Sequence, residues 1–263
     1  MVFEEILDKI GKRKIYSLFL GILYVLISYG TANLFFPNNI SLAMIFLTTL
    51  LLIPSTAKLI GIEENIERRY GTSKFLKKHY VLMEIFFFLF IGIFIGYILL
   101  GNYAPSSVEY QMNFLKSQGV NLLNTKIEAV PQLLGIFLNN ISVIVVAFVL
   151  SLFYGVGALF LIVLNASVFA SFVLNLLTTI SQQKAFGVLF VLLHFIPEVF
   201  GFLLAAIAGG VISKAIMKEK PWTEEFRNVL KDGTLLLLLS LVIILLAALI
   251  ETFVTPQILK PLL

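Results

Sequence analysis

The chain has 263 residues, of which 59% are hydrophobic and only 13% charged, and it contains no cysteine. Soluble domains carry roughly 25% charged residues, so the composition excludes a water-soluble globular protein and predicts an integral membrane protein. The lack of cysteine excludes disulfides and cysteine-ligated metal centres, and a net charge of +4 does not indicate a nucleic-acid partner, because basic residues in a membrane protein mainly set its orientation.

Seven apolar stretches are long enough to cross a bilayer as helices, since one crossing takes about 20 residues. In chain order they cover residues 15–36, 40–60, 81–101, 133–153, 157–177, 186–212 and 234–255. The first is long enough to span and lacks a cleavage site, so we interpret it as a membrane helix rather than a signal peptide. We therefore predict an all-α, polytopic protein forming a single integral membrane domain over residues 1–263.

The segments outside the spans are short. Residues 61–80 are charged and predict a helical cytoplasmic connector, while residues 102–131 form the longest outer loop, in which residues 108–117 predict a short amphipathic helix. Residues 221–225 resemble a helix start with acidic residues in the first turn. That start predicts a cytoplasmic helix that runs up to Lys231.

The distribution of Lys and Arg predicts the orientation, because cytoplasmic segments carry an excess of both. With the N-terminus inside, 15 of the 19 basic residues lie in inner segments and four in outer segments. We expect the N-terminus inside, the C-terminus outside and a location in a prokaryotic cell membrane.

His194 and Glu198 lie four residues apart in the sixth predicted span, so they share one helical face. A charged side chain near the bilayer centre costs a few kcal/mol or more, which makes such groups functional-site candidates. Gly201 and Ala205 continue the same face and indicate that it packs against protein rather than lipid. Pro197 removes a backbone donor and leaves a carbonyl free beside the pair. We expect a proton or cation site here.

The remaining intramembrane polar groups are Asn139 and Asn140 in the fourth span, Asn165 and Asn175 in the fifth and Glu251 in the seventh. A rise of about 1.5 Å per residue places most of the polar groups in the outer half of the bilayer, with Asn165 and Glu198 near its centre. This bias predicts a polar pocket that opens outward.

Each of these residues also has a structural interpretation. His194 and Glu198 would then be a hydrogen-bonded pair that joins helices, asparagines commonly bridge spans, and Glu251 would extend its carboxylate to the outer surface.

Enzymatic chemistry has little support in the sequence. The spacing of His194 and Glu198 resembles part of a zinc-ligand set, but the only other histidine, His79, lies on the predicted cytoplasmic side. Ser/His/Asp sets and Gly-rich phosphate loops are absent from the sequence. We expect no catalytic residue and no cofactor apart from a bound cation, for which His194 and Glu198 are the candidate ligands.

Gly92 and Gly96 form a GxxxG pattern in the third span, which indicates either close helix packing or a dimer face. The partners that we expect are the lipid bilayer, with a homodimer and partner membrane or envelope proteins as candidates, and no nucleic acid.

An ordered set of motifs between residues 133 and 256 resembles the stage II sporulation protein M family, in particular its broad prokaryotic branch. The set comprises Phe137-Leu-Asn-Asn140, Tyr154-Gly-Val-Gly157, Asn165, His194-x-x-x-Glu198 and Glu251-Thr-Phe-Val-Thr-Pro256. Ala166 and Phe195 depart from the family pattern, which often has glycine after the asparagine and after the histidine. The resemblance implies a membrane scaffold that works with peptidoglycan hydrolases, a sporulation role that we do not expect to transfer to this chain.

From the residues themselves, the leading hypothesis is transport or sensing of a small solute or cation, with Glu198 as the responsive carboxylate. The alternative is a non-catalytic scaffold that recruits partner proteins, and the third is a membrane metallohydrolase. Substitution of Glu198 by Gln separates them: a transporter loses flux, a scaffold keeps its partners, and a hydrolase loses turnover together with metal.

Overall fold

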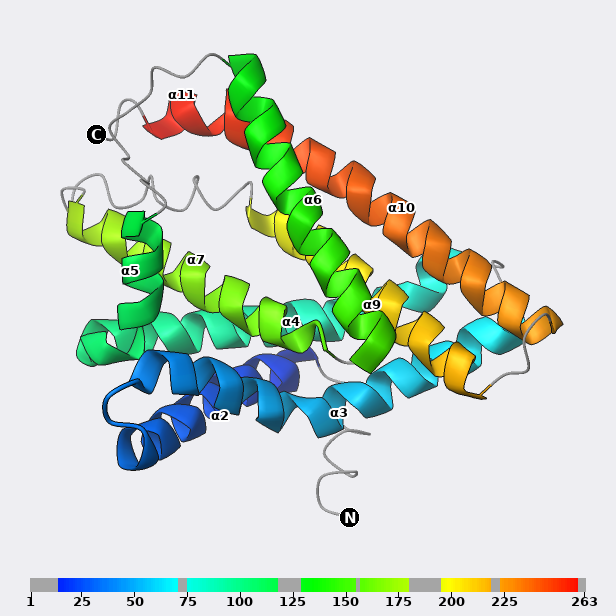
Figure 1. Cartoon of the computed structure of the whole chain (residues 1–263), viewed down its shortest axis with the longest axis horizontal. Helices are drawn as coiled ribbons and strands as arrows, with labels where there is room; N and C mark the ends of the chain where they lie inside the picture. Colours follow the sequence, from blue (N-terminus) through cyan, green and yellow to red (C-terminus); the bar gives the residue numbers. More distant parts are fainter. Residues whose placement is uncertain are drawn as a thin grey trace.

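The computed structural model describes residues 14–70, 75–117, 129–154, 157–179, 195–218 and 223–259, and within these ranges it contains helices and no strands (Figure 1). Seven helices are long and apolar enough to cross a membrane. They are α2 (Lys14–Phe35), α3 (Ile40–Tyr70), α4 (Phe75–Tyr103), α6 (Ala129–Tyr154), α7 (Leu159–Thr179), α9 (Phe195–Lys218) and α10 (Glu224–Phe253). The described residues also form three short helices: η1 (Pro105–Ser107) and α5 (Glu109–Ser117), which follow α4, and α11 (Thr255–Leu259), which follows α10. The predicted seven-helix, all-α fold is confirmed.

Several helices continue beyond the predicted spans. Residues 61–70 extend α3 and residues 75–80 begin α4, whereas residues 71–74 of the predicted connector lie outside the described residues. The helix start predicted at residues 221–225 is confirmed, because the hydroxyl of Thr223 accepts a hydrogen bond from the backbone N–H of Phe226 at 3.3 Å. The prediction that this helix ends at Lys231 is wrong. Nothing in the sequence breaks it there, so it runs directly into the seventh span as α10.

Helix α9 lies at the centre of the bundle, flanked by α6 and α10 (Figure 1). Of the residues in its membrane-spanning window, 78% are buried within the molecule, compared with 17% for α6. Glycines allow this close packing, because a Cβ at Gly201 would lie 2.7 Å from the side chain of Ile244 on α10, and one at Gly209 would lie 2.5 Å from the carbonyl oxygen of Phe148 on α6. The prediction that the small-residue face of the sixth span packs against protein is confirmed.

The GxxxG pattern of α4 packs against α2 within the same chain. A Cβ at Gly92 would clash with the backbone of Leu18, and one at Gly96 would lie 3.0 Å from the Cβ of Val25. Of the two roles predicted for this pattern, helix packing is confirmed. The same face is therefore covered and is not free for a second copy.

The short helix α5 crosses the end of α7 (Figure 1), and it confirms the helix predicted at residues 108–117. The hydroxyl of Ser41, at the start of α3, accepts a hydrogen bond of 3.0 Å from the backbone N–H of Tyr110. This bond ties α5 to the end of the bundle where α2 ends and α3 begins.

Candidate functional site

Two carboxyl groups and an amide meet where α6, α9 and α10 pack together. The side-chain nitrogen of Asn140, on α6, donates a 2.8 Å hydrogen bond to Oε1 of Glu198 on α9. The carboxyl group of Glu198 is also hydrogen-bonded to that of Glu251 on α10. We refer to Asn140, Glu198 and Glu251 as the carboxyl cluster.

The helices place these side chains by simple periodicity. Asn140, Ile144 and Ala147 recur every three or four residues and are buried, so they form the inward face of α6. Glu198 lies in the first turn of α9, where the partial positive charge of the helix N-terminus favours an acidic side chain. Glu251 lies in the last turn of α10. Since α9 begins at the end of the bundle where α10 ends (Figure 1), the two carboxyl groups meet there.

The contact between Glu198 and Glu251 brings two acidic groups close enough to share a proton. A carboxylate only accepts hydrogen bonds, whereas a protonated carboxyl group also donates one. The two carboxyl groups can therefore hydrogen-bond to each other only while at least one of them is protonated. Asn140 supplies a further N–H that satisfies an oxygen of Glu198.

The carboxyl cluster is buried on one side and open on another. Glu198 is 4% exposed and Asn140 6% exposed, while Glu251 is half-buried, so the cluster reaches the surface of the molecule through Glu251. One to two turns further along the same helices, a layer of buried apolar side chains fills the space between them. This layer consists of Ile144, Phe202, Ala205 and Ile244.

Two further predicted site residues, Asn139 and Asn165, lie away from the carboxyl cluster. Asn139 is exposed on α6 and points away from the cluster. Asn165, on α7, donates a 2.9 Å hydrogen bond to the carbonyl of Leu161 in its own helix. His194 lies outside the described residues, so its predicted pairing with Glu198 stays a prediction.

The predicted depths differ from the observed geometry. Counting residues placed Glu198 about 8 Å deeper than Asn140 and about 12 Å deeper than Glu251, yet the three side chains are hydrogen-bonded to one another. The count assumed that every helix is perpendicular to the membrane and that the sixth span starts at residue 186. In the structure, α9 begins at Phe195, which places Glu198 in its first turn, and α6 crosses α9 at an angle (Figure 1).

Asp232 is a buried acidic residue that was not among the predicted site residues. This residue is 0% exposed on α10 and lies 19 residues before Glu251, about 28 Å along the helix axis. The prediction started the seventh span at residue 234, so it assigned Asp232 to the cytoplasmic segment. The sequence does contain a signal for the burial of Asp232. The three- and four-residue spacings that connect it with Val229, Leu236 and Ser240 place it on the same buried face of α10.

Side chains that could hold a metal ion are few in the part of the chain that the structure describes. There, no group of three or more His, Cys, Asp or Glu residues lies together. The carboxyl cluster offers carboxylate and amide oxygens, which are ligands that suit protons and hard cations rather than soft metals.

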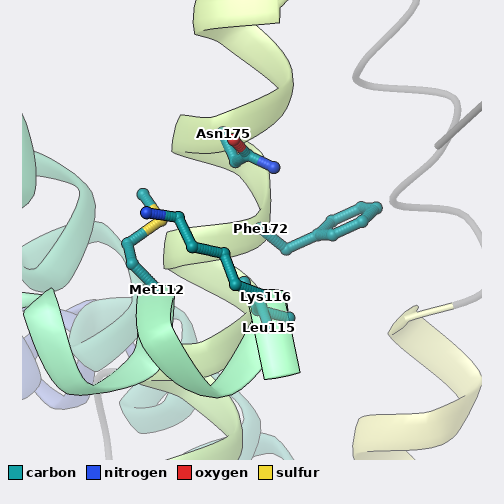
Figure 2. Close-up of a pocket in the computed structure, with 5 residues that line it drawn as sticks. All are labelled: Met112, Leu115, Lys116, Phe172 and Asn175. Atoms are coloured by element: carbon teal, nitrogen blue, oxygen red, sulfur yellow. The ribbon is translucent and has the colours of Figure 1, made fainter. Parts of the chain in front are cut away.

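A separate small hollow lies between α5 and α7. Figure 2 shows its five lining residues, three on α5 and two on α7: Met112, Leu115, Lys116, Phe172 and Asn175. Its volume of about 40 Å³ is close to the volume of a single water molecule. The hollow is therefore too small for an organic solute.

Comparison with known proteins supports the resemblance seen in the sequence. The family model described as Stage II sporulation protein M matches residues 85–256. The match starts well before residue 133, so it includes most of α4 as well as all three helices of the carboxyl cluster. No curated protein and no solved structure matches the chain.

Proposed function

The chain belongs to the stage II sporulation protein M family, and from this membership and the carboxyl cluster we propose that it binds a proton or a small cation in order to transport or sense a small solute. The family and the seven apolar helices make it a multi-pass membrane protein. We propose the prokaryotic cell membrane as its location, with Glu198 and Glu251 as the ion-responsive groups.

The observation that carries the proposal is the hydrogen-bonded pair Glu198 and Glu251. Ionisable groups inside membrane segments are costly, and they are common in proton relays and ion pathways. The proton of the pair can be exchanged for a small cation held between the same oxygens. Because the carboxyl groups belong to different helices, gain or loss of that ion alters the contact between α9 and α10.

The buried apolar layer favours gated transport or sensing over an open channel. A channel requires a continuous polar path, whereas Ile144, Phe202 and Ile244 fill the space next to the carboxyl cluster. An ion that enters past the half-buried Glu251 would stop at this layer until the helices rearrange. Such a rearrangement is what alternating access or signal transmission requires.

We expect Glu198→Gln and Glu251→Gln each to reduce proton-coupled or cation-coupled flux at least tenfold in proteoliposomes. Glutamine retains the size and hydrogen-bonding capacity of the side chain but does not titrate. The assay imposes H⁺, Na⁺ or K⁺ gradients and records internal pH and cation content. Glu109→Gln, which changes an exposed carboxylate on α5, is the matched control and should retain full flux.

The same variants test the scaffold alternative. If flux across the vesicles is absent in the unaltered protein, or is equal in the unaltered protein and both glutamine variants, the transport proposal is wrong. Ion-dependent changes in intrinsic fluorescence, from Trp222 and the tyrosines, would then decide whether the cluster senses an ion without transport. Unchanged recovery of membrane partners together with absent flux and absent ion response would favour a scaffold.

A further inference from the structure

Helix α6 carries a second asparagine that lies outside the face holding the carboxyl cluster. Consecutive helical residues point about 100° apart, so Asn140 faces α9 while its neighbour Asn139 faces outward. The Asn139 side chain is exposed, and among the described residues no hydrogen bond to it is found. It lies about 10 Å along the helix from Gln132, where the spanning segment of α6 begins.

A lipid-facing amide at this position needs a partner. Hydrocarbon offers no hydrogen bonds, and an unsatisfied amide there costs about 2 kcal/mol or more. Asparagine in membrane helices commonly meets this need by hydrogen-bonding across to a neighbouring helix. The inner face of α6 is already occupied by α9 and α10, so no helix among the described residues is left to pack against Asn139, and a second copy of the chain can supply this neighbour.

The exposed residues of α6 form a regular seam. Six of them recur with spacings of four, three, four, three and four, all exposed: Gly135, Asn139, Ser142, Val146, Val149 and Phe153. This is the repeat by which two helices pack along one another in a left-handed pair. A Cβ at Gly135 would have nothing within 4 Å, so a second helix can approach closely at this end.

We propose that this seam, from Gly135 to Phe153, is the contact surface of a symmetric homodimer in which the two Asn139 amides hydrogen-bond to each other. Two copies inserted with the same topology have parallel α6 helices, and a twofold axis along the membrane normal brings identical residues together. An asparagine amide both donates and accepts, so it is complementary to its own copy. A single asparagine in such a seam also fixes the register of parallel helices.

The proposed contact can be tested by disulfide cross-linking. Because the chain contains no cysteine, each introduced cysteine is the only thiol in its protomer. Ser142→Cys and Val146→Cys place one thiol at the proposed contact, and each should form a disulfide-linked dimer when membranes are oxidised. Val242→Cys is the matched control, since Val242 is an equally lipid-exposed residue on α10. It should stay monomeric. Equal cross-linking at Val242, or none at Ser142 and Val146, overturns the proposal.

The role of Asn139 is tested separately. Asn139→Leu should raise the dissociation constant of the dimer in bilayers roughly threefold or more, because one interhelical amide contact is worth about 0.6 kcal/mol or more. Single-molecule photobleaching in vesicles over a range of protein densities measures this constant. Asn139→Gln, which keeps an amide, should retain most of the association. Equal dissociation constants for the unaltered protein and Asn139→Leu would exclude the amide pair.

Discussion

At the level of single residues, Asn140 stabilises the carboxyl cluster, because its side-chain N–H donates a hydrogen bond to a buried oxygen of Glu198. We expect Asn140→Ala to lower the free energy of unfolding by about 1–3 kcal/mol, the range for leaving a buried polar group without its partner. Thermal unfolding in detergent, followed by circular dichroism, measures the effect.

Asn165→Ala is the control for this substitution. Within the described residues, the side chain of Asn165 bonds only to the carbonyl of Leu161 one turn earlier in its own helix, and that carbonyl is also available to the helix backbone. The expected loss is therefore well under 1 kcal/mol. A larger loss at Asn165 than at Asn140 would contradict the central place given to the carboxyl cluster.

At the level of helices, the contact between α2 and α4 depends on glycine. Gly92→Ala places a methyl group against the backbone of Leu18, and we expect a loss of about 1–3 kcal/mol, as for other overpacked interiors. Gly30→Ala on α2 is the matched control, because a Cβ there meets nothing within 4 Å. Alanine at Gly30 should leave stability unchanged or raise it by up to about 1 kcal/mol. Equal destabilisation by both variants would contradict the packing described for Gly92.

Hydrophobic length predicts the helices well, because the cost of exposing backbone groups to hydrocarbon leaves few alternatives to a helix. The ends of the helices are harder to predict. Charged residues such as Lys231 and Asp232 mark the end of an apolar window but do not break a helix, so α10 continues through both. An apolar window measures the part of a helix that fits the membrane, not the whole helix.

The carboxyl cluster could be predicted only in part. The sequence places Asn140, Glu198 and Glu251 inside the membrane, but it contains no information on how far each helix tilts. Nor does it separate Asn139 from Asn140, since both are candidates until the inward face of α6 is known. Packing against α9 makes that choice, because the buried Ile144 and Ala147 place Asn140 on the inward face.

At the scale of the whole molecule, three long helices extend beyond the membrane core on the same side. Helices α3, α4 and α10 have 31, 29 and 30 residues, which is about 45 Å each and longer than the roughly 30 Å hydrocarbon core. The excess lies at the end of α3 and at the starts of α4 and α10. These ends carry six of the 15 basic residues of the predicted inner segments, so helix length and charge favour the same inner side.

The orientation itself can be measured with single cysteines in the cysteine-free chain. Glu109 on α5 and Glu225 at the start of α10 are both exposed, and they lie at opposite ends of the bundle (Figure 1). With the N-terminus inside, Glu109→Cys should react with a membrane-impermeant maleimide in intact cells, and Glu225→Cys should react only after permeabilisation. The reverse pattern would invert the orientation. The half-buried Glu251 would then open the carboxyl cluster toward the cytoplasm, and the proposed ion would enter from inside.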